Sequence, residues 1–174
     1  MTTPPIRVGV VGVGRGKTFM RTAQVTGMKL VAICDTWEEK LLHEGAQLSV
    51  ETYTDYVEFL NHDMDAVVLA NYFHEHAPFA IQALEKGKHV MSETAACHTL
   101  AEGVALARAV EKSNKIYFFA ENYPYMAYNQ EMRRLYKEGN IGRFRYGEGE
   151  YVHPDPADVV LARSCGRDHW RNWI

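Results

Sequence analysis

The sequence predicts an α/β fold over residues 1–120, in which a doubly wound parallel sheet carries helices on both faces. Short apolar runs alternate there with stretches of helical length. A glycine-rich turn follows the first run, and an aspartate ends the second. With 174 residues, the chain has room for this domain and for the beginning of another at 121–174.

Five apolar runs have the composition of buried strands. They occupy residues 6–11, 29–34, 65–70, 89–91 and 116–120. Most are rich in Val, Ile, Leu or Ala and are bounded by glycine or turn residues, as is typical of strands buried on both faces. Helices between consecutive strands imply right-handed crossovers, so we expect the strands to be parallel.

Four segments between these strands have helical signatures. They occupy residues 16–26, 38–48, 74–86 and 99–112. Gly87 is a C-terminal stop for the third of them. Thr99 caps the fourth, and Glu102 completes a capping box three residues later.

The pattern changes after Glu121. We expect a helix over 124–138, and then a half-exposed strand over 144–152, where apolar residues alternate with charges and glycines. No finished element is predicted over 153–174. We therefore expect the residues beyond about 150 to be poorly packed or to need partner chains, in a truncated second domain.

Composition limits the functional class. A net charge of −3, from 19 basic and 22 acidic side chains, indicates neither a nucleic-acid nor a membrane partner. No apolar run reaches the roughly 18 residues that span a bilayer. The first strand starts within a few residues of Met1, which leaves no room for a signal peptide. Three widely spaced cysteines indicate a reduced, cytoplasmic location.

The glycine-rich turn after the first strand predicts a diphosphate site. Gly12 would permit the tight turn and Gly14 the close approach of the phosphates, at a helix N-terminus with free N–H groups. Lys17 stands where GxGxxG, counted from Gly12, has its third glycine. We therefore expect Gly16 to make the helix–strand contact one residue earlier. Arg15 and Lys17 can add positive charge near the phosphates.

Two alternatives remain for this turn. The tripeptide 16–18, Gly-Lys-Thr, is similar to the phosphate loop of nucleotide hydrolases, and 31–35 could serve as the magnesium-binding strand. That loop requires a glycine where Val11 stands, so it would be one residue short. The other alternative is a glycine turn that binds no ligand.

Asp35 favours the dinucleotide hypothesis. It ends the second strand 21 positions after Gly14, near the spacing of the acid that binds the adenosine ribose diol. A carboxylate there would repel a 2′-phosphate, and no arginine follows in 36–39, so we expect NAD rather than NADP. The alternative role of Asp35 is a simple helix cap. The predicted site includes Gly12, Val13, Gly14, Arg15, Gly16, Asp35 and Thr36.

These residues resemble the N-terminal part of the Gfo/Idh/MocA oxidoreductases, which include glucose–fructose oxidoreductase and inositol dehydrogenase. The family's order and spacing are kept over nearly the whole chain. The matching segments are 7–12, Asp35, 54–55, 65–70, His76, 83–90, Glu93, 121–122, 137–142 and Trp170-Arg171.

The resemblance implies a Rossmann domain that binds a nicotinamide dinucleotide, followed by an incomplete α+β substrate domain. It adds to the cofactor site Asn71 and Tyr72, which follow a central strand, and His76, which matches a family histidine near the cofactor. It also adds Glu93, the glutamate of the family's Glu-Lys-Pro motif beside the nicotinamide, and Asn122. A capping or surface role is the alternative for His76.

The sequence departs from the family at the catalytic residues. Thr94 stands where the family has a lysine that assists proton transfer, and a threonine cannot act as an acid at neutral pH. An aspartate–histidine motif is expected beyond Trp170-Arg171, and His153, Asp168 and His169 do not match it by position. The catalytic residues are therefore unknown.

No metal site is expected, because the His74-Glu75-His76 run is not HExxH and lacks a third ligand nearby. The leading hypothesis is the NAD-binding domain of an oxidoreductase that acts on a sugar, polyol or related hydroxy compound. A redox-neutral, NAD-dependent glycosidase and a non-catalytic dinucleotide-binding module are the alternatives. We expect this chain alone to bind NAD without turnover, and the longer protein to form a homo-oligomer.

Overall fold

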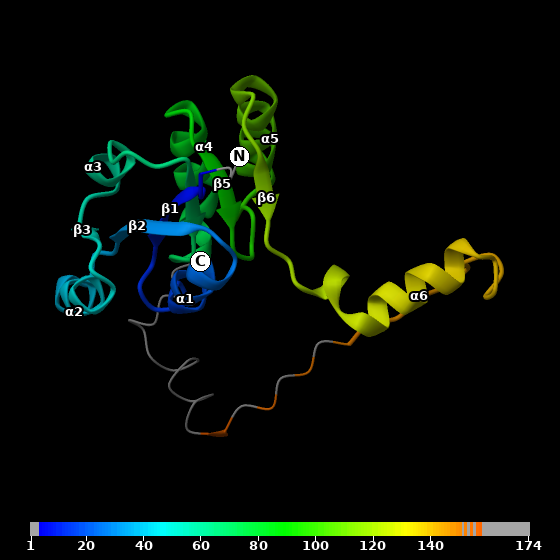
Figure 1. Cartoon of the computed structure of the whole chain (residues 1–174). Helices are drawn as coiled ribbons and strands as arrows, with labels where there is room; N and C mark the ends of the chain where they lie inside the picture. Colours follow the sequence, from blue (N-terminus) through cyan, green and yellow to red (C-terminus); the bar gives the residue numbers. More distant parts are fainter. Residues whose placement is uncertain (1–3, 151, 153, 155, 158–174) are drawn as a thin grey trace. The chain divides into compact units, whose positions relative to one another are not determined.

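The computed structural model describes residues 4–150, 152, 154, 156 and 157, and the chain divides after Glu121 into two units. The first unit holds a six-stranded sheet with the order β3-β2-β1-β4-β5-β6, and every neighbouring pair is parallel (Figure 1). The strands are β1 (Arg7–Val11), β2 (Lys29–Cys34), β3 (Glu51–Tyr53), β4 (Ala66–Leu69), β5 (His89–Ser92) and β6 (Tyr117–Phe119).

Helices cover both faces of this sheet. They are α1 (Lys17–Val25), α2 (Glu38–Leu48), α3 (Tyr56–Leu60), the 3-10 turn η1 (Phe73–Glu75), α4 (His76–Glu85) and α5 (Leu100–Ser113). On one face Met20 of α1 and Leu41 of α2 join a buried apolar cluster with Val10. On the other face, Phe59 of α3 and Leu84 of α4 join a second one. The predicted doubly wound α/β fold is thus confirmed.

Local sequence signals explain the helix ends. Thr99 Oγ1 accepts a hydrogen bond from the Glu102 N–H at 3.2 Å, and the Glu102 carboxylate accepts one from the Thr99 N–H at 2.9 Å. The capping box is therefore present as predicted. The expected helix over 74–86 is divided into η1 and α4.

Two elements of the first unit, β3 and α3, were not predicted from the sequence. β3 is only three residues long and lies at the edge of the sheet, so its apolar pattern is short. The signal for α3 is Asp55, whose carboxylate accepts a hydrogen bond from the Glu58 N–H at 2.8 Å.

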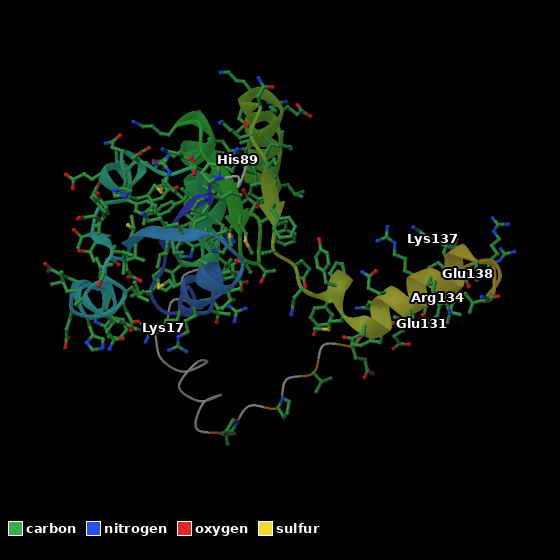
Figure 2. All side chains as sticks on the ribbon, in the orientation of Figure 1. Lys17, His89, Glu131, Arg134, Lys137 and Glu138 are labelled. Carbon is green, nitrogen blue, oxygen red and sulfur yellow. The ribbon has the colours of Figure 1, made fainter. Side chains whose placement is uncertain are left out.

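The second unit contains the 3-10 turn η2 (Tyr123–Tyr125) and the helix α6 (Ala127–Lys137). Arg134 pairs at 2.6 Å with both Glu131 and Glu138, one turn before and one turn after it on the helix surface (Figure 2). Because α6 lies within the expected range 124–138, its prediction is confirmed.

The predicted strand over 144–152 is wrong: its described residues, 144–150 and 152, form no strand. An extended segment becomes a strand only when a neighbour accepts and donates its backbone hydrogen bonds, and alternation of side chains does not supply that neighbour. None of the helices among the described residues is long and apolar enough to cross a membrane.

Candidate functional site

The carboxyl ends of the central strands form the edge at which the predicted site residues gather. In the order β3-β2-β1-β4-β5-β6, the chain reverses its direction of winding between β1 and β4. Ligands of doubly wound sheets bind in the crevice at such a reversal. The glycine turn leaves β1 here, Asp35 follows β2, Asn71 follows β4 and Glu93 follows β5.

Two glycines of the turn are required by close packing. Gly12 has φ +93°, and a Cβ atom on it would collide with the carbonyl oxygen of Ala70. A Cβ atom on Gly16 would collide with the Gly12 carbonyl oxygen and lie 2.8 Å from Val10 Cγ1. Gly16 therefore lies at the close contact between α1 and β1 that was expected of it.

Open space surrounds the middle of the turn. No heavy atom beyond the immediate chain neighbours lies within 4 Å of the position of a Cβ atom on Gly14. The N-terminus of α1, which begins at Lys17, has neither a side-chain cap nor an acidic residue in its first turn. Its positive dipole end is therefore available to an anion.

Asp35 joins the end of β2 to the glycine turn. Its Oδ2 accepts a hydrogen bond from the Val13 N–H at 2.7 Å, and its Oδ1 accepts one from the Trp37 N–H at 2.9 Å. Trp37, rather than Asp35, is the N-cap residue of α2. A carboxylate oxygen can accept more than one hydrogen bond, so Asp35 retains capacity for a ribose hydroxyl. The following Thr36 is exposed.

Both cations near the turn are paired with carboxylates. Two guanidinium nitrogens of Arg15 lie 2.5 Å from Glu93 Oε1 at the end of β5. Lys17, the first residue of α1, pairs at 2.5 Å with the buried Glu44 of α2. Arg15 thus reaches across the end of β4, whereas Lys17 bridges two helices on one face of the sheet.

Glu93 and Thr94 form a compact hydrogen-bonded turn after β5. The Glu93 side chain is 12% exposed, and its Oε2 accepts hydrogen bonds from the Thr94 N–H at 3.0 Å and from the Thr94 hydroxyl at 3.3 Å. The Glu93 N–H donates to the Leu69 carbonyl of β4 at 2.9 Å. The Thr94–Ala95 peptide bond is cis.

His76 is buried, with 1% of its surface exposed, so it has neither the surface nor the capping role. Its Nδ1–H donates to the Ala95 carbonyl at 2.8 Å, which makes Nε2 an acceptor in the neutral ring. Asn71 donates from Nδ2 to Glu75 at 3.0 Å. His76 Nε2 and Asn71 Oδ1 are both buried without a hydrogen-bond partner among the described residues.

The other predicted residues are less closely associated with this edge. Tyr72 is 41% exposed, and its ring is nearly parallel to that of His74 at 5.9 Å. Asn122 belongs to the second unit, where it is exposed and its carbonyl accepts a hydrogen bond from the Tyr125 N–H at 3.0 Å. The residues His153, Asp168, His169, Trp170 and Arg171 lie outside the described residues.

The environment of Cys34 shows how well the β2 end is shielded. Burial raises the pKa of its thiol to about 12, and the carboxylates of Asp35 and Asp55 add to that shift. Cys97, which follows the turn after β5, is half-buried, and both thiols are unpaired. Within the described part of the chain, no group of three or more His, Cys, Asp or Glu residues could hold a metal ion.

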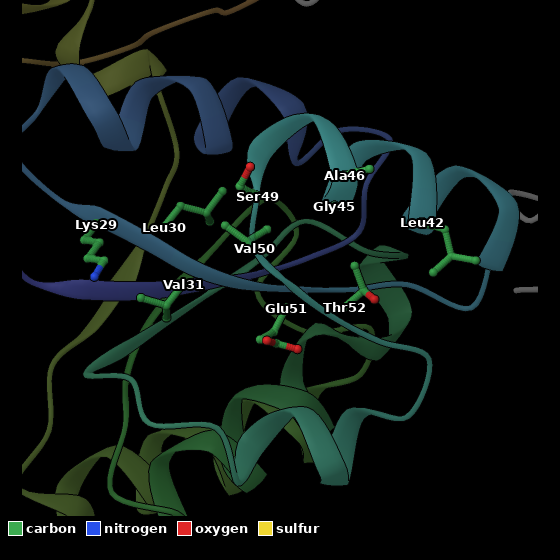
Figure 3. A pocket seen from close by; sticks show the side chains of 10 residues that line it. All are labelled: Lys29, Leu30, Val31, Leu42, Gly45, Ala46, Ser49, Val50, Glu51 and Thr52. Atoms are coloured by element: carbon green, nitrogen blue, oxygen red, sulfur yellow. The ribbon is translucent and has the colours of Figure 1, made fainter.

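A hollow of about 550 Å³ lies elsewhere in the domain, between α2, β2 and β3 (Figure 3). Its lining includes Lys29, the first residue of β2, together with Gly45 and Thr52. None of the predicted site residues lines it.

Comparison with known proteins identifies the fold. The family model described as "Oxidoreductase family, NAD-binding Rossmann fold", the Gfo/Idh/MocA model, matches residues 6–121. The chain belongs to this family. Its first unit is the NAD-binding Rossmann domain, as the sequence predicted.

Individual proteins are also similar to this chain in sequence or in structure. A "Glycosyl hydrolase family 109 protein 1" from Shewanella sp. (strain MR-4) is 31% identical over 161 residues, 85% of this chain and 35% of the relative. Apo scyllo-inositol dehydrogenase from Lactobacillus casei has a TM-score of 0.75 at 25% identity, covering 82% of this chain and 44% of that one.

The WlbA dehydrogenase from Bordetella pertussis, solved with NADH and UDP-GlcNAcA, has a TM-score of 0.74 at 26% identity, covering 80% of this chain and 44% of that one. The chain therefore spans less than half the length of these three relatives.

Three features of the edge fit a dinucleotide. Space is open beside Gly14, the N-terminus of α1 is uncapped, and two buried acceptors lack a partner among the described residues.

The contacts that complete this edge, Arg15 with Glu93 and His76 with Ala95, were not predicted. Arg15 and Glu93 are 78 positions apart, and no single-sequence pattern indicates such a pairing.

Proposed function

We propose that the protein whose cofactor domain this chain contains is an NAD-dependent oxidoreductase that transfers a hydride between nicotinamide and a sugar, polyol or related hydroxy compound. The observation that carries the proposal is the carboxyl edge of the sheet, where an open glycine turn and Asp35 meet in a domain of the NAD-binding family. When bound, NAD accepts or delivers the hydride at C4 of its nicotinamide ring.

The adenosine half of NAD is assigned to the β1–β2 side. The Asp35 carboxylate accepts hydrogen bonds from the ribose hydroxyls, and the exposed Thr36 lies beside it. The N–H groups of Gly14 and Arg15, at the open middle of the turn, are assigned to the diphosphate. The N–H groups of Gly12, Val13 and Gly16 donate to the Cys34 carbonyl, the Asp35 carboxylate and the Gly12 carbonyl, so these three residues hold the shape of the turn around it. NAD is preferred to NADP because Asp35 would repel a 2′-phosphate.

The nicotinamide half is assigned to the β4–β5 side. Asn71 Oδ1 and His76 Nε2 are buried acceptors that suit donors such as an amide or a hydroxyl. Glu93 follows β5 at the same edge, and Tyr72 follows β4. Asn122 is assigned to this half because of its place in the family pattern.

The substrate class is a sugar or polyol, and the pocket for it is assigned to the part of the protein that follows the cofactor domain, together with the catalytic residues. The dehydrogenase relatives support this class, since their names include scyllo-inositol and their complexes include UDP-GlcNAcA. We also assign the protein to the cytoplasm, which the unpaired thiols Cys34 and Cys97 support, and expect it to assemble as a homo-oligomer.

A redox-neutral glycosidase is the second candidate. The sequence relative named as a glycosyl hydrolase of family 109 favours it, and so does Thr94, which cannot transfer a proton as the family lysine does. Such an enzyme would retain NAD through purification and would hydrolyse glycosides without net production of NADH.

The test uses two proteins. This chain alone should bind NAD⁺ and NADH in calorimetry but should not produce NADH with any sugar or polyol. The longer protein should produce NADH from NAD⁺ and at least one member of a broad sugar and polyol panel. Glycoside hydrolysis with retained NAD and no net NADH would select the second candidate. Intact NAD binding with neither activity would indicate a non-catalytic module.

A further inference from the structure

The ion pair between Arg15 and Glu93 bridges the two halves of the candidate site. Arg15 belongs to the turn after β1, Glu93 follows β5, and β4 lies between these strands in the sheet. The contact of 2.5 Å therefore crosses the end of β4. The Arg15 side chain is 66% exposed, whereas that of Glu93 is 12% exposed.

The two partners are held unequally. Glu93 keeps two further hydrogen bonds from Thr94, and its backbone is bound to β4, so its carboxylate stays in place without Arg15. Arg15 has no other partner among the hydrogen bonds and ion pairs of the described side chains. A guanidinium group carries a positive charge, so Arg15 is the cation of this pair.

The pair lies on the nicotinamide side of the proposed site. Asp35 follows β2 on one side of the reversal between β1 and β4, and Glu93 follows β5 on the other. If Asp35 binds the adenosine ribose, the nicotinamide half extends toward Glu93. This step rests on the proposed function, because it requires a bound dinucleotide with that orientation.

The two redox forms of the cofactor differ by one unit of charge, and that charge is on the nicotinamide ring. The oxidised ring is a cation and the reduced ring is neutral, while the diphosphate is the same in both. A fixed cation beside the ring therefore favours NADH, and a fixed anion favours NAD⁺. A close pair of opposite charges nearly cancels both effects.

We propose that Arg15, by pairing with Glu93, offsets the effect of that carboxylate on the preference of this site between NAD⁺ and NADH. In the intact pair, the Arg15 guanidinium neutralises a carboxylate that would otherwise hold the oxidised cofactor more tightly. The pair thereby brings the affinities for the two forms closer together than Glu93 alone would.

Calorimetric titration of this chain with NAD⁺ and with NADH at low ionic strength tests the proposal, through the ratio of the two dissociation constants, Kd(NAD⁺)/Kd(NADH). Arg15→Met leaves the Glu93 carboxylate unpaired and should lower the ratio about three- to tenfold, as expected for unit charges roughly 10 Å apart in a medium between protein and water. Glu93→Gln leaves the Arg15 cation unpaired and should raise the ratio by a similar factor.

Three further variants complete the design. The double variant, Arg15→Met with Glu93→Gln, should return the ratio to within about twofold of the original, because both charges are absent. Arg15→Lys keeps the cation and should keep the ratio. Arg21→Met removes one exposed cation from α1 outside the proposed site and should leave the ratio unchanged.

Two results would overturn the proposal, and both differ from a failure of the proposed function. If Arg15→Met weakens NAD⁺ and NADH by the same factor, Arg15 acts on the diphosphate and not on the ring. If neither single variant moves the ratio, the pair does not face the nicotinamide. Absence of binding by the unaltered chain would instead refute the proposed function itself. Arg15 is largely exposed, so Arg15→Met decides the question even if Glu93→Gln does not fold.

Discussion

The two sides of the carboxyl edge are built by different means. On the β1–β2 side, the backbone determines the shape: Gly12 and Gly16 leave no room for side chains, and Asp35 binds the Val13 N–H of the same turn. On the β4–β5 side, the contacts are made by polar and charged side chains rather than by a tightly packed backbone turn. Arg15 meets Glu93 there, and His76 binds the turn after β5.

This difference also bears on how the two sides depart from the expected sequence patterns. Backbone packing tolerates few substitutions, so the β1–β2 side keeps the dinucleotide pattern even though Lys17 replaces the third glycine. Side-chain contacts can be exchanged without altering the strands. On the β4–β5 side, Glu93 is followed by Thr94, at the position where the resemblance led us to expect a lysine.

The largest effect is expected from Gly12→Ala on the β1–β2 side. The added methyl group would collide with Ala70 and would strain a backbone at φ +93°, so the free energy of unfolding should fall by about 3 kcal/mol or more. Gly14→Ala is the matched control, because its methyl group would meet open space. It should leave stability within about 0.5 kcal/mol and weaken NAD binding about tenfold.

Chemical denaturation and NADH titration of both variants measure these effects. If Gly12→Ala were as stable as the original chain, the turn would have more freedom than the contacts with Ala70 allow. If Gly14→Ala bound NADH normally, the open space beside Gly14 would not be the place where the diphosphate approaches.

Asp35→Ala sharpens the assignment of the adenosine half. Removing the carboxylate takes away a charged acceptor of ribose hydrogen bonds, so NAD affinity should fall by about 1.5–3 kcal/mol. Circular dichroism checks that the fold persists, since the Val13 N–H also loses its acceptor. Unchanged affinity for NAD in a folded variant would contradict the role of Asp35.

His76→Phe probes the β4–β5 side. A phenyl ring fills similar space but cannot donate to the Ala95 carbonyl, so we expect the free energy of unfolding to fall by about 1–2 kcal/mol. Thermal unfolding of the variant measures the loss. His43→Phe, at a solvent-exposed position on α2, is the control and should change stability by less than about 0.5 kcal/mol. Equal effects of the two substitutions would show that the His76 contact adds no stability.

The smallest expected effects concern the thiols of Cys34 and Cys97. Cys34, with its pKa raised to about 12 by burial, should react with a disulfide reagent much more slowly at pH 8 than the half-buried Cys97, in a Cys165→Ser background. The unfolded state loses the Cys34 proton at lower pH than the folded state does. Folding stability should therefore fall as pH rises above about 9, and this decline should be smaller in Cys34→Ala. Faster reaction of Cys34 would show that the end of β2 is open.

Much of the fold could be predicted because its signals are local. Apolar runs identify buried strands, and Thr99 with Glu102 identifies a helix start. The roles of Gly12, Gly16 and Asp35 could also be predicted from the sequence, because each residue follows a predicted strand at the spacing typical of a dinucleotide site. The His76–Ala95 contact could not, because nothing in the neighbouring sequence indicates which backbone group accepts the proton on Nδ1.

The strand expected over 144–152 failed for a related reason. Its alternating pattern describes how side chains would be distributed on a sheet, but the sheet requires a second strand that supplies hydrogen bonds. The strand β3 is the opposite case, because it has a neighbouring strand but no clear sequence pattern. It has only three residues and is recognised by its parallel pairing with β2, not by its composition.

A crystal structure of this chain with NADH tests the assignment of the two sides most directly. We predict that the adenosine ribose hydroxyls lie within hydrogen-bond distance of the Asp35 carboxylate, that the diphosphate lies against Gly14, and that the nicotinamide ring is on the side of Glu93. A nicotinamide ring beside Asp35, or a cofactor bound away from the carboxyl edge of the sheet, would contradict it.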